Sequence, residues 1–250
     1  MGKEQNSERE AAFFNRLLNE CSDYTEIVSE DGVELFFRIG SLDTITGMKV
    51  LEAGSGIGAI GRKIARNGNV VVGIDISPQM VQTANSFGEK NYHAIVANIE
   101  DQKAFEDATF DLICCHNVLH HLPAIDKAMY GFFKWLKPKG KIIIFEPNGS
   151  NPVSKLCSLL ANRLARLNER YFHRNFICTS NVVFHTIRSY SAQINNYGLD
   201  ILHCRSYLSG SLNSNPVSCV IYLLHRFVGA FLPKNLKGNG LLIIAQKRSP

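Results

Sequence analysis

The residues best able to do chemistry stand at the ends of short apolar segments. Glu52 and Asp75 each close a run of apolar residues, and a glycine-rich stretch from Gly54 to Gly58 follows Glu52 directly. Glycine allows a sharp turn and lets a ligand approach main-chain N–H groups closely. A helix that begins there adds the positive end of its dipole. The carboxylate of Asp75 is placed to accept hydrogen bonds from a ribose diol.

The glycine-rich stretch by itself fits two kinds of ligand. Gly56, Gly58 and Gly61 have the spacing G-x-G-x-x-G, and Asp75 follows about 20 residues later, as in dinucleotide-binding folds. The same stretch also has the form E-x-G-x-G-x-G, beginning at Glu52. A carboxylate suits a ligand with an ammonium group and sits poorly beside a pyrophosphate. The stretch therefore favours such a ligand, and an NAD(P)-linked oxidoreductase is the alternative.

Histidines follow the fourth apolar segment, at His116, His120 and His121. A histidine near its usual pKa of about 6.5 can accept a proton from a reacting group. Because adjacent histidines at a helix start point in different directions, one of His120 and His121 is expected to cap or pack while the other faces the cleft. We take His116 and His121 as the candidate catalytic bases.

Apolar, β-branched segments alternate with helical ones from residue 48 onward. Strands are expected at residues 48–53, 70–74, 92–96, 110–115, 141–145, 199–207 and 241–246. Helices are expected at residues 60–67, 78–87, 125–136 and about 181–196. This alternation predicts an α/β fold with a parallel sheet and right-handed crossovers. Ligands of such sheets bind at the carboxyl ends of the strands.

Five stretches between Met48 and Pro147 carry these features in order: VLEAGSGIG, VVVGIDISPQM, VANIED, FDLICCHNVLHHL and LKPKGKIIIFEPN. Together they resemble the class I S-adenosylmethionine-dependent methyltransferases, in particular the ubiquinone/menaquinone-biosynthesis-like group. The resemblance implies a single doubly wound Rossmann-like domain with a mostly parallel seven-stranded sheet, an antiparallel last strand and helical lid insertions. It also implies S-adenosylmethionine as cofactor and S-adenosylhomocysteine as product.

The resemblance assigns a part of the cofactor to each matching residue. The methionine part packs on four residues of the loop: Gly54, Ser55, Gly56 and Gly58. Glu52 helps to place its amino group, and Asp75 accepts hydrogen bonds from both ribose hydroxyls. The adenine is expected between Ile76 and Met80, at Asn98 and at the N–H of Ile99. His116 ends the fourth strand beside the sulfonium.

Asn98 departs from the family, which usually has Asp at this position. An asparagine oxygen can still accept a hydrogen bond from the adenine amino group. We therefore expect altered affinity for the cofactor, with binding retained.

We predict one domain over residues 1–250, with a helical cap at 1–45, a cofactor-binding core at 46–147, and lid insertions at 148–180 and 208–239. The first insertion has a basic amphipathic pattern near 154–170, and the second an apolar stripe between Val217 and Phe231. One interpretation is that both helices pack on the core or on each other. The other is a hydrophobic, lipid-like acceptor taken up at a membrane surface, with peripheral membrane contact.

Composition and the absence of certain motifs limit the classes of ligand and partner that we expect. The net charge of +5, with 27 Lys and Arg against 22 Asp and Glu, is too small to argue for nucleic acid. Since no D/N-P-P-Y/F motif follows the fourth strand, a small-molecule acceptor is expected. None of the seven cysteines forms a C-x-x-C pair, so no metal site is expected. A polar start without an apolar h-region predicts a cytoplasmic location, and a non-catalytic cofactor-binding partner of a larger complex stays an alternative.

Overall fold

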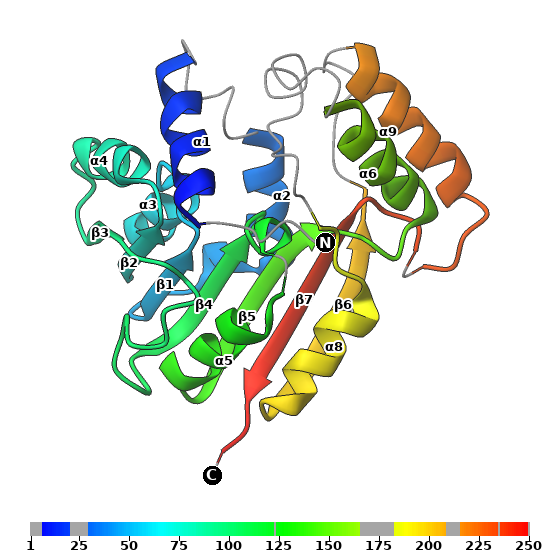
Figure 1. The fold of residues 1–250 in the computed structure, drawn as a ribbon. Helices are drawn as coiled ribbons and strands as arrows, with labels where there is room; N and C mark the ends of the chain where they lie inside the picture. The colour runs from blue at the N-terminus through cyan, green and yellow to red at the C-terminus, as the bar shows by residue number, and fades with distance from the viewer. Residues whose placement is uncertain are drawn as a thin grey trace.

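A seven-stranded sheet forms the centre of the molecule (Figure 1). This computed structural model describes residues 7–20, 30–122, 124–165, 183–208, 216–234 and 236–249. The strands are β1 (Lys49–Ala53), β2 (Val70–Asp75), β3 (Tyr92–Val96), β4 (Phe110–His116), β5 (Leu136–Pro147), β6 (Leu199–Tyr207) and β7 (Gly240–Lys247). Their order is β3-β2-β1-β4-β5-β7-β6. Only β7 is antiparallel to its neighbours, β5 and β6, so the predicted α/β class and sheet type are confirmed.

Helices cover both faces of this sheet. The described helices are α1 (Ser7–Glu20), α2 (Glu30–Gly40), α3 (Ala59–Arg66), α4 (Pro78–Ser86), α5 (Asp126–Trp135), α6 (Pro152–Ala165), α8 (Ile187–Asn196) and α9 (Pro216–Gly229), with short 3-10 turns η2 (Leu42–Thr44) and η3 (Leu119–His121). One core layer joins the sheet to α5 and α8, and the other joins it to α2, α3 and α4. The fold is therefore doubly wound, as its alternating sequence predicts.

The period of two in the strands supplies both core layers. In β1, Leu51 and Ala53 face the α5 side, while Val50 belongs to the α3 side; all three are fully buried. Strands with helices on both faces are apolar on both sides. This explains why these segments are nearly continuous apolar runs.

Element boundaries differ from the prediction by more than two residues in two places. Strand β5 begins at Leu136, directly after α5, because Leu136 pairs with Phe110 of β4 before the register shifts. Helix α8 begins at Ile187, where the Thr186 side chain accepts a hydrogen bond from the Ser189 N–H. The helix expected from about residue 181 is therefore shorter at its start; residues 181 and 182 lie outside the described part.

The strand order reverses between β1 and β4, which pair in parallel. Parallel strands that leave this point toward opposite sides open a crevice at their carboxyl ends. Figure 1 shows α1 at this end of the sheet, while α6 and α9 lie beside each other near the ends of β6 and β7. The candidate site follows from the loops that leave β1, β2, β4 and β5 here.

Candidate active site

The loop after β1 turns on three glycines. Gly54, Gly56 and Gly58 have φ values of 69°, 51° and 73°, a region that favours glycine. At Gly54 a Cβ atom would collide with the Val118 side chain, so the protein itself fills that side. At Gly56 a Cβ would meet no atom within 4 Å. Among these glycines, Gly56 is the one whose backbone faces open space that a ligand can use.

Tyr92, the first residue of β3, lies under the same loop. A Cβ at Gly58 would stand 2.5 Å from the Tyr92 hydroxyl oxygen, and one at Gly61 would stand 2.5 Å from the Tyr92 ring. Gly73 of β2 also meets this hydroxyl. Gly58, Gly61 and Gly73 thus make room for a tyrosine ring. No local pattern marks this role in the sequence, because the tyrosine and the loop are far apart along the chain.

The Glu52 side chain is directed toward the start of α3. Its Oε2 accepts a hydrogen bond from the Tyr92 hydroxyl at 3.3 Å, and the N–H groups of Ile60 and Gly61 also contact the carboxyl group. Burial raises the pKa of Glu52 to about 8, against the lowering effect of these hydrogen bonds. The group is therefore mostly protonated at neutral pH. Its predicted part in placing an amino group of a ligand stays a prediction.

Asp75, at the end of β2, is joined to the glycine loop. Its Oδ2 accepts from the Gly56 N–H at 2.9 Å, and its Oδ1 accepts from the Ser77 N–H at 2.9 Å. Burial raises the pKa of Asp75, while these two N–H groups and the nearby His121 oppose the rise. Each carboxylate oxygen can accept a second hydrogen bond. The carboxylate is thus held at the edge of the open side of Gly56 with capacity for two hydroxyl groups.

Ser77 caps α4. Its Oγ accepts from the Met80 N–H at 3.1 Å, and Pro78 is the first helical residue. Because the Ser77 N–H donates to Asp75, the helix cap also orients this carboxylate.

His116 ends β4 between two aromatic rings. It stacks on Phe145 of β5 with ring centroids 5.4 Å apart, and its edge meets Phe36 of α2 at 5.1 Å. Burial lowers the pKa of His116 to about 4, so the imidazole is neutral at physiological pH. Its Nε2 is buried and has no hydrogen-bond partner among the described residues. A buried ring nitrogen without a partner is unusual in a protein interior, and a bound ligand group would satisfy it.

Glu146, near the end of β5, organises the loop after β4. Its Oε1 accepts from the N–H groups of Val118 and Leu119 at 2.7 and 2.8 Å, and its Oε2 from that of His120 at 3.3 Å. The His120 Nδ1 lies 2.7 Å from Oε2. Burial alone would raise the pKa of Glu146, but His120 and these N–H groups lower it. The loop that carries the histidines is therefore fixed by one buried carboxylate.

The chain turns sharply between His116 and this loop. Asn117 has a φ of 54°, a left-handed conformation that asparagine tolerates. Its N–H donates to the carbonyl of Phe145 at 2.9 Å, which holds the turn against β5. This turn brings the next three N–H groups toward Glu146.

The adjacent histidines contact each other, with ring centroids 4.2 Å apart, but have different carboxylate neighbours. His120 packs on Glu146, whereas the His121 Nδ1 lies 3.4 Å from Glu10 Oε2 of α1. That one of them faces the cleft stays a prediction. The edge of His121 also meets Phe14 at a centroid distance of 5.3 Å. Burial, and then the neighbouring His120, lower the pKa of His121. His121 therefore lies under α1 on the Asp75 side, and its role as a base stays a prediction.

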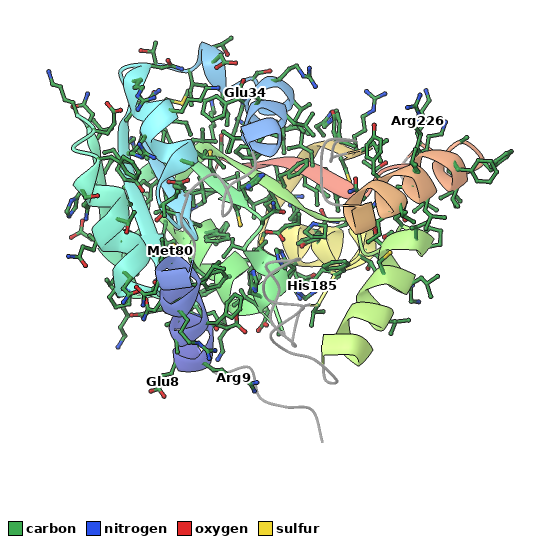
Figure 2. All side chains as sticks on the ribbon, turned by 90° about the horizontal axis from the view of Figure 1, so that it is seen from above. Glu8, Arg9, Glu34, Met80, His185 and Arg226 are labelled. Atoms are coloured by element: carbon green, nitrogen blue, oxygen red, sulfur yellow. The ribbon has the colours of Figure 1, made fainter. Side chains whose placement is uncertain are left out.

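The residues expected around the adenine lie at the ends of β2 and β3. Met80 is 2% exposed and packs with Phe13 and Leu17 of α1; Figure 2 shows Met80 beside α1. Ile99 is buried in the core layer of α5. Ile76 is half-buried. Asn98 Oδ1 accepts from the Glu100 N–H at 2.9 Å, so part of its capacity as an acceptor is already used.

Sequence reasoning missed Glu146, Tyr92 and Glu10. The signal for Glu146 was present, because it is a single carboxylate that follows four apolar residues at the end of a strand. Tyr92 and Glu10 meet the site through contacts between distant segments, which no short pattern reveals.

The fold is that of a class I Rossmann-like domain, and comparisons with known proteins agree. A family described as "Methyltransferase domain" matches residues 45–217. The ubiquinone biosynthesis O-methyltransferase of Xanthomonas oryzae pv. oryzae is 28% identical over 166 residues, covering 65% of this chain and 69% of that enzyme. The phosphoethanolamine N-methyltransferase of Triticum aestivum is 37% identical over 121 residues, covering 47% of this chain and 24% of that enzyme.

A solved structure of an S-adenosylmethionine-dependent methyltransferase from Mesorhizobium loti has the same fold. Its TM-score is 0.58 at 16% identity, and the match covers 86% of this chain and 100% of that one. The chain therefore belongs to the methyltransferase domain family and is an S-adenosylmethionine-dependent methyltransferase. The family match decides against the NAD(P)-linked and non-catalytic alternatives.

The residues present fit this cofactor. The open backbone at Gly56 adjoins a carboxylate that can accept from two hydroxyl groups. The pairing of a diol with Asp75 needs acceptors only, and a carboxylate supplies them. Gly54 and Gly58, by contrast, meet protein atoms on the side a Cβ would occupy. Their predicted packing against the cofactor stays a prediction.

Proposed function

We propose that this methyltransferase modifies a hydroxyl group of a small, largely apolar acceptor, with His116 as the proton acceptor. The observation that carries the proposal is the environment of His116. Its neutral imidazole lies between Phe36 and Phe145, and its buried Nε2 has no hydrogen-bond partner among the described residues. These aromatic surroundings suit an acceptor molecule that is apolar next to its hydroxyl group. The O-methyltransferase relative from Xanthomonas oryzae pv. oryzae supports a hydroxyl acceptor.

The cofactor supplies an electrophilic methyl group on a positively charged sulfur. The protein supplies position and exclusion of water. Asp75 holds the ribose hydroxyls, since its own carboxylate is oriented by the N–H groups of Gly56 and Ser77. Glu146 fixes the loop from Val118 to His120, and this loop closes against Gly54. His116 takes the proton of the acceptor hydroxyl as the new bond forms.

The remaining assignments belong to the same proposal. The methionine part contacts the loop after β1, the adenine lies between β2 and β3, and His121 is a second candidate base. The residues concerned are Glu52, Gly54, Ser55, Gly58, Ile76, Met80, Asn98, Ile99 and His121. Residues 1–45 are proposed as a cap, and 148–180 and 208–239 as the acceptor lid.

A methyl-transfer assay with radiolabelled cofactor tests this proposal. We expect transfer to alkylated phenols and little transfer to phosphoethanolamine, whose charges suit neither Phe36 nor Phe145. His116→Gln should lower turnover about a hundredfold or more, because the proton acceptor is lost. The affinity for the cofactor should stay within about threefold, a smaller change than the loss of one hydrogen bond to the cofactor would cause. His93→Gln, on an exposed position of β3, is the matched control. Full activity of His116→Gln, or transfer to phosphoethanolamine alone, would contradict the proposal.

A further inference from the structure

Helix α9 turns an apolar stripe outward. Four of its side chains follow the spacing i, i+3, i+4, i+7, which places them on one face of a helix. Their exposed fractions are 57, 49, 46 and 70% for Val220, Leu223, Leu224 and Phe227. His225, in the same helix, is only 2% exposed, so the helix packs on the molecule through its other side. Phe231, just beyond the helix, is 79% exposed.

Helix α6 continues this surface. Leu156 and Leu159 are 57 and 62% exposed, and Lys155 beside them is exposed as well. Helices α6 and α9 contact each other, as Figure 1 shows at the β6 side of the sheet. We call the exposed apolar side chains of α6 and α9, together with Phe231, the outer apolar face. Apolar residues gathered in this way mark an interaction surface.

Charge divides the chain into two unequal parts. Residues 147–250 contain twelve Lys and Arg but only two acidic residues, Glu169 and Asp200. Residues 1–146 contain fifteen Lys and Arg and twenty Asp and Glu. The positive excess of the protein therefore belongs wholly to the part that carries α6 and α9.

Four exposed cations are close along the chain to the outer apolar face: Lys155 in α6, Arg226 in α9, and Lys234 and Lys237 in the segment that follows α9. Within the ranges that the structure describes, none of them is in an ion pair with an acidic side chain. Figure 2 shows Arg226 at the outer side of α9. An apolar face with a basic border is the pattern of a helix that lies in the surface of an anionic bilayer.

We propose that the outer apolar face docks on an anionic lipid membrane, with α6 and α9 lying in the interfacial plane. A second copy of this chain is a poorer occupant, because it would bring the same positive border against this one. No helix among the described residues is long and apolar enough to cross a bilayer, so this contact is peripheral. The proposal does not rest on the acceptor assigned above, since docking requires only the surface.

Vesicle flotation of the full chain tests this docking. The vesicles contain phosphatidylcholine alone or with about one third phosphatidylglycerol, a negative surface that attracts basic residues. We expect binding to the anionic vesicles at low salt, weaker binding at high salt, and little binding to the neutral ones. The double variant Phe227→Ser with Phe231→Ser should lower the partition coefficient at least about tenfold. Arg226→Glu should lower it by about tenfold.

A matched pair of valines controls for loss of apolar surface in general. Val220→Ser lies on the outer apolar face, whereas Val70→Ser lies on β2 with a similar exposed fraction of 54%. Only Val220→Ser should weaken flotation. Absence of wild-type binding at low salt, or equal binding by the Phe227 and Phe231 double variant, would overturn the proposal. A dimer that becomes monomeric in that variant, without flotation of the wild type, would assign the face to a second copy.

Discussion

Two buried ionisable side chains at the site have pKa values displaced in opposite directions. Burial lowers the pKa of His116 to about 4 and raises that of Glu52 to about 8, because each loses the hydration of its charged form. Both groups are thus largely neutral in the folded protein at pH 7. Burying them uncharged avoids most of the cost of placing charges beside the core.

The His116 displacement makes stability fall in acid. An unfolded histidine titrates near 6.5, so between pH 6.5 and pH 4 the unfolded state binds a proton that the folded state does not. Stability that is fully present above pH 6.5 is lost as the pH falls through this window, by at most about 3 kcal/mol. The Glu52 shift acts with the opposite sign, from pH 4.5 to about 8.

His116→Phe should remove the part of the unfolding free energy that is lost in acid, because phenylalanine keeps the ring stacking and does not titrate. We expect its unfolding free energy, measured by urea titration, to fall less steeply than that of the wild type between pH 6.5 and pH 4. His93→Phe, at an exposed position, is the control and should keep the wild-type slope. Equal slopes in His116→Phe and the wild type would contradict the low pKa of His116.

Glu146 should be the most sensitive polar residue of the site. Glu146→Gln keeps the shape but weakens the acceptor for three N–H groups and for His120, so we expect a loss of about 3 kcal/mol in unfolding free energy. A double-mutant cycle with His120→Gln isolates their coupling by urea denaturation. A loss below about 0.5 kcal/mol, the range of ordinary surface substitutions, would show that Glu146 does not organise this loop.

At the scale of elements, α3 is held to β1 by a contact that excludes any side chain at Gly61. The residue lies in the helix at an ordinary φ, so glycine is required here for space alone. The Glu52 carboxyl group and the Tyr92 ring occupy the place of its Cβ. The glycine pattern in the sequence predicted a turn and a ligand, and the packing of a tyrosine ring explains a large part of it.

Gly61→Ala should destabilise the protein by about 1–3 kcal/mol, the usual cost of overpacking. Gly131→Ala in α5 is the control: its nearest neighbour would be 3.2 Å away and the gain in helix propensity is about 1 kcal/mol. Adding Tyr92→Val to Gly61→Ala should recover part of the lost stability. Thermal unfolding is compared for the wild type, the two single variants and the double variant. Wild-type stability of Gly61→Ala would contradict this packing.

Sequence reasoning predicted the elements that repeat one local rule. All seven strands lie over the segments that the sequence predicts, and the central strands β1, β4 and β5 are apolar because helices cover both of their faces. Helix α8 started later than expected, because Thr186 caps it and helix periodicity alone does not mark its start. Glu146 acts on the loop after β4, and Tyr92 contacts Glu52 of β1 and Gly73 of β2, so their roles appear only once the sheet is assembled.

For the whole molecule, the candidate cofactor site and the outer apolar face lie toward the same end of the sheet. Helix α1 packs on Met80 and contacts His121, the loops after β1 and β4 carry other residues of the candidate site, and α6 and α9 lie near the end of β6. Under the proposed docking, an acceptor dissolved in the membrane would enter from this end of the molecule.

Calorimetric titration with S-adenosylmethionine is the most direct test of the central claim, that the Gly56–Asp75 edge of the sheet holds this cofactor. We expect micromolar binding to the wild type, with S-adenosylhomocysteine binding in parallel and NAD(H) not binding. Asp75→Asn should weaken it by at least about tenfold, since an amide supplies one acceptor oxygen where the carboxylate supplies two. Asp200→Asn, in an exposed ion pair with Arg248, is the control and should bind like the wild type. Binding of NAD(H) alone, or undiminished binding by Asp75→Asn, would contradict the account.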